Sequence, residues 1–131
     1  MEVRMDLAQI RICEIHDQQV IVLRERNGTR TLQIVIGLPE ILAIDRRVKG
    51  ATSARPLTHD LLGNVIECLS AEIEKIVISD LRNHTFYAKL VLRQNGSMVE
   101  VDSRPSDAIA VGVGADVPIY VAEHVLREAA Q

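Results

Sequence analysis

Two short segments of the chain place an arginine and a proline directly before a hydroxyl and an aspartate. Residues 55–60 read RPLTHD, and residues 104–107 read RPSD. Proline biases the arginine before it toward an extended backbone, which presents the guanidinium group. A helix that starts at such a segment favours an anion at its free N–H groups. Each segment is therefore a candidate phosphate site, with the ligands Arg55 and Thr58 in the first and Arg104 and Ser106 in the second.

His59 adds a group that could transfer a proton. It stands beside Asp60 at the expected start of a helix, where an imidazole could act as a general base. A purely structural interpretation stays open, because Thr58 and Ser106 suit the N-cap position of a helix. Aspartate in a first helical turn also offsets the helix dipole, so Asp60 and Asp107 could serve stability alone.

Four carboxylates at expected strand ends or helix starts are candidate metal ligands: Glu40, Asp60, Asp80 and Asp107. Mg²⁺ and Mn²⁺ prefer oxygen ligands, and a bound ion can activate water against a phosphodiester. Junctions of this kind often gather at one edge of a sheet, so two or three of these groups could converge on one ion. The alternative is a set of separate surface carboxylates, and the spacing does not decide between them.

The composition narrows the possible functions. The chain has 131 residues, of which 47% are hydrophobic, which is enough for one globular domain. With one Phe, two Tyr and no Trp, it lacks a stacking platform for single-stranded nucleic acid. The net charge of −3 differs from the basic balance of proteins that bind nucleic acid through phosphates. We expect no sequence-specific recognition of nucleic acid.

The sequence also limits the cellular compartment and the cofactors that we expect for this protein. Cys13 and Cys68 lack the spacing of a zinc site, and two isolated thiols fit a reducing compartment. The first residues, MEVRMD, do not have the pattern of a signal peptide. Apolar runs are too short to cross a membrane. We therefore expect a cytoplasmic protein that does not contact membranes.

Periodic patterns predict one α+β domain over residues 1–131. Strands are expected at 3–15, with a bulge near residue 8, and at 20–23, 31–36, 74–80, 86–92, 98–101 and 118–121. Helices are expected at 39–49, 58–73, 106–114 and 122–130. The Asn-Gly pairs at 27–28 and 95–96 predict hairpins. Because both halves share a three-strand-then-helix order, we expect a mainly antiparallel sheet of two three-strand units with helices packed on it.

Four ordered motifs together resemble the bifunctional nuclease domain family. They are RPLTHDLL at 55–62, DLR at 80–82 with TFYA at 85–88, DSRPSDAIA at 102–110 and PIYVAE at 118–123. QIVIG at 33–37 followed by Glu40 fits an early motif of the same family. The resemblance runs from about residue 3 to residue 126. It implies hydrolysis of RNA and DNA without sequence specificity, assisted by Mg²⁺ or Mn²⁺, with His59, Asp60 and Asp107 in catalysis.

The chain departs from the family pattern at a few positions. Many members have Trp where this chain has Val35, and Ala where it has Ile41. The helix after Asp107 is usually rich in Ala and Leu, whereas here it continues as VGVGA over residues 111–115. Each glycine costs about 1 kcal/mol of helix propensity relative to alanine. These changes affect the expected shape of the pocket and leave the two Arg-Pro segments intact.

A second function stays open beside the nuclease. The acidic charge and the few aromatic residues favour a non-catalytic module that binds a nucleotide or another anion, or that serves in assembly. In that case, exchanging Asp107 for Asn would lower stability and would have no turnover to remove. Exposed strand edges also predict a homodimer or another homo-oligomer.

Overall fold

The computed structural model describes residues 1–13, 15–16 and 18–130, and it contains one sheet and four α-helices. The strands are β1 (Glu2–Cys13), β2 (Gln18–Glu25), β3 (Thr31–Ile36), β4 (Ala71–Arg82), β5 (Thr85–Gln94), β6 (Ser97–Ser103) and β7 (Ile119–Ala122). The helices are α1 (Leu38–Val48), α2 (Thr58–Cys68), α3 (Pro105–Gly112) and α4 (Glu123–Ala129), with a 3₁₀ turn at Val113–Ala115. The predicted α+β class is confirmed.

All seven strands belong to one mixed sheet in the order β3-β2-β1-β7-β4-β5-β6. Strand β7 lies between β1 and β4, antiparallel to the first and parallel to the second. Every other pairing is antiparallel, as the hairpin signals predict. The expected description as two three-strand units is not confirmed, because the late strand β7 joins β1–β3 and β4–β6 into one continuous sheet.

Local backbone features agree with several sequence signals. Asn95 and Gly96 both have positive φ angles, 51° and 77°, which a two-residue hairpin turn requires. The register of β1 against β2 shifts between Leu7 and Gln9, which confirms the expected bulge. The pair at 27–28 lies in a longer connection between β2 and β3, and only the second of the two Asn-Gly hairpins is a tight turn. Residue 15 lies in a turn after β1, and not in the strand.

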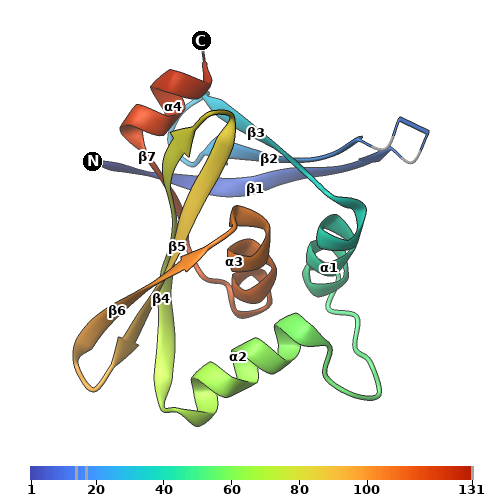
Figure 1. Ribbon diagram of the computed structural model, residues 1–131, viewed down its shortest axis with the longest axis vertical. Coiled ribbons are helices and arrows are strands. Elements are labelled where there is room, and N and C mark those ends of the chain that lie inside the picture. The colour runs from blue at the N-terminus through green and yellow to red at the C-terminus, as the bar shows by residue number, and fades with distance from the viewer. Residues whose placement is uncertain (14, 17, 131) are drawn as a thin grey trace.

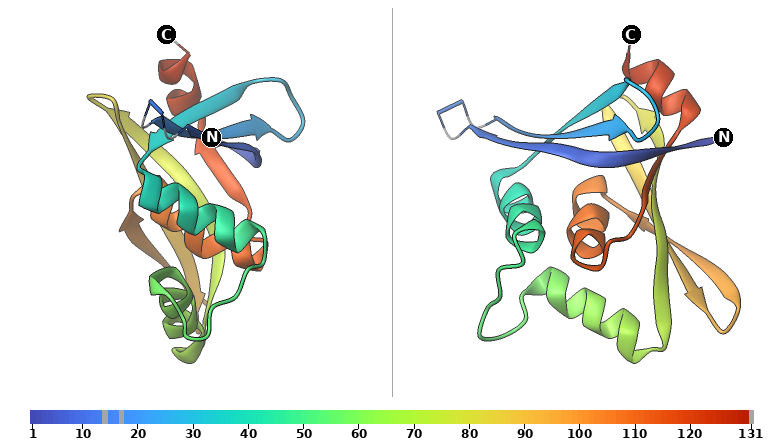
Figure 2. Two further views of the ribbon diagram at one scale, coloured as in Figure 1. Left: turned by 90° about the vertical axis from the view of Figure 1, so that its right-hand side faces the viewer. Right: turned by 180° about the vertical axis from the view of Figure 1, so that it is seen from behind.

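The core is aliphatic and centres on α3. The sheet bends, so that β1–β3 and β4–β6 form two walls around this helix, while α1 and α2 lie on its open side (Figures 1 and 2). Fully buried side chains from both walls and from α3 meet there: Ile21, Leu23, Ile76, Ile78, Ile109, Val111 and Val121. Burial of this aliphatic surface is the main favourable term in folding. It also fixes α3, and therefore the start of α3, relative to the sheet.

Two helices bury less of their apolar face than their spacing predicts. In α1, Ile41 and Ile44 are buried, whereas Leu42 and Val48 are about half exposed. In α2, the only buried residue is Ile66, and the other apolar positions of the expected stripe are exposed: Leu61, Leu62, Val65 and Leu69. The helix ends at Cys68, so Ile73 belongs to β4. No helix in the described part of the chain is long and apolar enough to cross a membrane.

Candidate functional site

The start of α3 brings together three residues that the sequence analysis singled out. The Asp107 Oδ1 atom lies 3.0 Å from Nε2 of His59, which belongs to α2. The same carboxylate accepts hydrogen bonds from Arg104, whose Nε lies 2.9 Å from Oδ2 and whose Nη2 lies 3.2 Å from Oδ1. Asp107 thus holds an imidazole and a guanidinium group that are far apart in the sequence.

The backbone explains why Arg104 is presented at this point. Arg104 occupies the N-cap position of α3 with an extended backbone (φ −71°, ψ 146°), and Pro105 is the first helical residue. Its side chain is 65% exposed although one edge is bonded to Asp107. Ser106 is instead buried, at 4% exposure, and makes no capping hydrogen bond. The expected capping by Ser106 is therefore wrong, because α3 starts one residue earlier than predicted.

The charge of Asp107 is set by opposing effects. Burial alone raises the pKa of this carboxyl group, but the hydrogen bonds from Arg104 and His59 outweigh it and the pKa is lowered. Asp107 is therefore ionised at neutral pH. Because an ionised carboxylate only accepts hydrogen bonds, the Nε2 atom of His59 carries the proton that is shared with it. In the neutral form of His59, Nδ1 is then the ring nitrogen that can accept a proton.

Asp60 belongs to a different cluster, although it is the next residue after His59. It forms ion pairs with Arg46, at 3.1 Å, and with Arg47, both from α1. It also accepts a hydrogen bond from the backbone N–H of Leu57, which occupies the N-cap position of α2. The N-cap expected at Thr58 is therefore wrong, since Thr58 is the first helical residue. The Leu57 bond and the two arginines lower the pKa of Asp60.

The other predicted residues are more dispersed. Asp80, near the end of β4, bonds to Arg82 (2.6 Å), to the Leu81 N–H and to His124 (3.3 Å). The Arg82 bond is the main cause that lowers the pKa of Asp80. Arg55 lies exposed in the loop before α2, and no hydrogen bond or ion pair holds it to any other described residue. Thr58 is also exposed.

Glu40 and two of the predicted substrate ligands share one cavity, which we call the Arg104 cavity. It has a volume of about 310 Å³ and lies between β3, the start of α1, the β4–β5 turn and the start of α3. Glu40, Arg104 and Ser106 line it. His84 lines the same cavity, and the sequence analysis did not single it out. The sequence signal at this position is Asn83, which indicates a tight turn. In the structure Asn83 and His84 both adopt positive φ angles in that turn.

The predicted metal ligands do not assemble into one donor set. Among residues 1–13, 15–16 and 18–130, no group of three or more His, Cys, Asp or Glu side chains is placed to hold a metal ion. Asp60, Asp80 and Asp107 each have both carboxylate oxygens bonded, and each is paired with at least one arginine. A cation at any of them would have to share the carboxylate with a guanidinium group, whose positive charge repels it. The donor set therefore does not fit a divalent ion.

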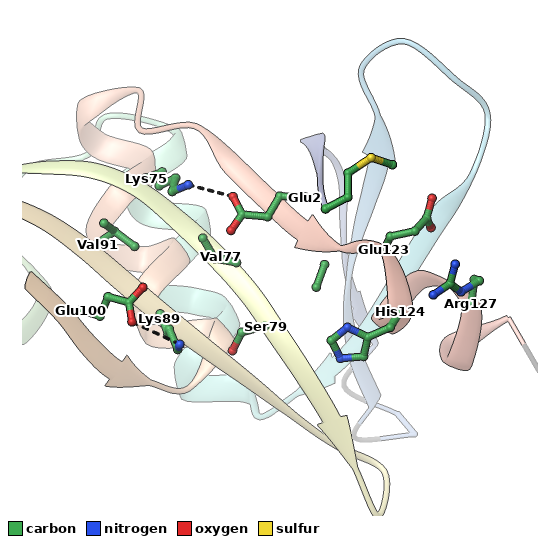
Figure 3. Close-up of a pocket in the computed structure, with 12 residues that line it drawn as sticks. Glu2, Lys75, Val77, Ser79, Lys89, Val91, Glu100, Glu123, His124 and Arg127 are labelled. Atoms are coloured by element: carbon green, nitrogen blue, oxygen red, sulfur yellow. Dashed lines mark hydrogen bonds and ion pairs between the residues drawn. The ribbon is translucent and has the colours of Figure 1, made fainter. Parts of the chain in front are cut away.

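A second cavity lies on the face of the sheet away from α3. It has a volume of about 560 Å³, and Lys75, Lys89, His124 and Arg127 are among its lining residues (Figure 3). Glu2 lies 2.8 Å from Lys75, and Glu100 lies 3.2 Å from Lys89. Acidic side chains thus pair with both lysines of this cavity.

The structure thus defines an α+β domain with an arginine, a histidine and an aspartate in contact at the start of one helix. The family model of the bifunctional nuclease domain matches residues 21–131, and the chain belongs to this family. It is 42% identical over 120 residues to an uncharacterised protein of Mycobacterium tuberculosis, covering 92% of this chain and 71% of that protein.

Two plant proteins are more distant relatives. The chain is 32% identical over 115 residues to bifunctional nuclease 2 of Oryza sativa, covering 84% of this chain and 35% of the rice protein. It is 28% identical over 110 residues to bifunctional nuclease 2 of Arabidopsis thaliana, covering 80% of this chain and 33% of the plant protein. The chain thus corresponds to about a third of each plant nuclease.

Proposed function

We propose that this protein hydrolyses phosphodiester bonds of RNA and DNA at the start of α3. The observation that carries the proposal is the contact between His59 and Asp107, with Arg104 bonded to the same carboxylate. The plant relatives bear the name of nucleases, which supports the same reaction class. Hydrolysis requires a base that accepts a proton from water and a cation that binds the phosphate. His59 and Arg104 would supply these two groups at the start of α3.

Each of the three residues has a distinct role in the proposed reaction. The Nδ1 atom of His59 accepts a proton from water as the water oxygen attacks phosphorus. The phosphorus bond to the leaving oxygen then breaks, and the same imidazole returns the proton to that oxygen. Arg104 uses the N–H groups that Asp107 does not occupy to bind the phosphate oxygens and to stabilise their developing charge. Asp107 is a positioning residue that fixes the tautomer of His59.

Because the nucleophile is water, the proposed reaction does not depend on whether the substrate contains ribose or deoxyribose. Attack by water does not use the 2′-hydroxyl group, so RNA and DNA are both substrates of the proposed site. The small number of aromatic residues and the net charge of −3 favour weak binding without sequence readout. Assistance by Mg²⁺ or Mn²⁺ stays a prediction from the sequence. The proposal needs no metal-dependent step, because the carboxylates are engaged by arginines.

The test is cleavage of fluorescently labelled single-stranded RNA and DNA by the purified protein, with Mg²⁺, with Mn²⁺ and with EDTA. We expect H59Q to lower kcat about 10²- to 10⁴-fold, the range for loss of a general base. R104K should also lower activity, because lysine cannot hold a carboxylate and a phosphate through one planar fork. H16Q, which changes an exposed histidine outside the site, is the matched control and should keep full activity.

Three results would decide against the proposal. Equal activity in wild type and H59Q would indicate a contaminating nuclease. Activity that requires metal and disappears in D60N, while H59Q remains active, would move the chemistry to Asp60. Absence of activity in all preparations would favour a non-catalytic anion-binding module. One observation supports that second function: Asp107 already links two helices, as a purely structural carboxylate would.

A further inference from the structure

Strand β3 forms one end of the sheet and pairs only with β2 among the described strands. Two cavities lie along it. Thr31, Leu32 and Gln33 line a cavity of about 610 Å³, whereas Ile34, Val35 and Ile36 line the Arg104 cavity. Side chains of successive strand residues point to opposite faces. A cavity lined by three consecutive residues therefore lies against the edge of the strand, where unpaired backbone groups project.

The opposite wall of both cavities is the start of β5. His84 and Phe86 line both cavities, so the two hollows adjoin at these residues. Strand β6 pairs with β5 only from Ala88 onward, which leaves residues 85–87 with an unpaired edge on that side. We use the name β3 seam for the two cavities between residues 31–36 and residues 84–86. Two unpaired strand edges thus border one elongated hollow.

Strand β3 lacks the features that usually protect a free edge. It contains no charged residue and no proline, and its register against β2 has no bulge. Val35 is 62% exposed. Strand β6, at the other end of the sheet, carries Glu100 and Asp102. Charge, proline and bulges are the usual means of blocking a strand edge, so the β3 edge is the one open to pairing.

We propose that the β3 seam binds an extended polypeptide segment, which adds to the sheet as a strand beside β3. In this mode of recognition, backbone hydrogen bonds supply affinity and the pockets select alternate side chains. Glu128 lines one cavity and Glu40 the other, and Arg104 is bonded to Asp107. The occupant should therefore carry Lys or Arg near its ends and β-branched or aromatic residues between them.

The test selects binders from a phage-displayed library of random nine-residue segments on the full-length protein. V35K places a charge on the β3 edge, and V99K does the same on β6 as the matched control. A selected peptide, made synthetically, should bind V35K at least about tenfold more weakly than wild type, while V99K should bind it like wild type. Bound peptide should slow amide exchange in residues 31–36. Circular dichroism of both variants confirms that they fold.

Other outcomes would overturn the assignment. Failure to enrich any sequence above a protein-free control would contradict it, as would equal affinity of the peptide for V35K. Displacement of the peptide by an eight-nucleotide oligouridine from wild type and R104K alike would assign the β3 seam to nucleic acid. A dimer that V35K dissociates without any peptide would assign it to a second copy of the chain. Because the readout is binding, these outcomes are independent of nuclease activity.

Discussion

Asp107 links the charge of the site to the stability of the fold. Its pKa is lowered in the folded protein, because the Arg104 and His59 bonds outweigh burial. The resulting stabilisation is fully present above the unfolded-state pKa of about 3.9 and is lost as the pH falls through the lower folded-state pKa. We expect D107N to be less stable than wild type at pH 7, with the difference shrinking as the pH falls below about 4. Urea denaturation across this range measures it, and a constant difference would contradict it.

Two glycines lie inside helices, Gly112 in α3 and Gly63 in α2, and they differ in the space around them. A Cβ atom at position 112 would lie 2.5 Å from Cδ1 of Ile76 and 3.2 Å from Cβ of Val117, so α3 approaches β4 closely. We expect G112A to cost about 1–3 kcal/mol through overpacking. G63A in α2 meets nothing within 4 Å and should instead stabilise by about 0.5–1 kcal/mol. Thermal denaturation of both variants checks the contrast in sign.

The three helices near the site are joined through one side chain of α1. Arg47 bonds to Asp60 of α2 and to the backbone carbonyl groups of Ala110 and Val111 in α3. Arg46 reaches only Asp60 and the carbonyl group of Ala51. Arg47 therefore satisfies acceptors near the end of α3 that would otherwise lack partners inside that helix.

This arrangement predicts different consequences for the two arginines. We expect R47A to lower the free energy of unfolding by about 1–3 kcal/mol and to speed amide exchange in α2, because buried acceptors lose their donor. R46A should have a smaller effect, since its contact with Asp60 is shared with Arg47. Hydrogen exchange followed by mass spectrometry measures both. Equal effects of R46A and R47A would show that the α3 carbonyl bonds contribute little.

The protein exposes an apolar surface on α2 and, among the described strands, has an unpaired strand edge at each end of the sheet, on β3 and on β6. Exposed side chains of this surface are Leu57, Leu61, Leu62, Val65 and Leu69. Contiguous apolar surface of this kind usually marks an interaction site. We expect a homodimer at micromolar concentration and a monomer after L61E with L69E. Light scattering measures the mass, and a mass of 14.5 kDa for the wild type would contradict the expectation.

Most of the fold could be predicted because local signals agreed with one another. The Asn95-Gly96 turn and the apolar run from Ile76 to Ile78 predicted strands that the structure contains. The position of β7 could not be predicted, because pairing of Val121 with Val3 is a long-range contact without a local signal. The apolar spacing of α2 predicted burial, yet the structure leaves that face exposed, since periodicity does not say what covers a helix.

The candidate site was predictable in type and only partly in geometry. The Arg-Pro segments and His59 could be chosen because their chemistry is evident from residue type. Sequence adjacency suggested that His59 and Asp60 act together, whereas the structure pairs His59 with Asp107 and Asp60 with Arg47. Successive helical residues project in different directions, so adjacency along α2 separates their partners. His84 was missed because its neighbours in space come from other elements.

The central position of β7 has a consequence for synthesis on the ribosome. Strand β1 is made well before one of its two neighbours in the sheet, β7, because β2–β6 all lie between them in the sequence. Before β7 is made, β1 and β4 each have an unpaired edge, and β1–β3 are not yet joined to β4–β6. Nascent chains with unpaired strand edges are prone to aggregate. The edges of β1 and β4 are therefore the segments that a chaperone would shield during synthesis, until β7 is added.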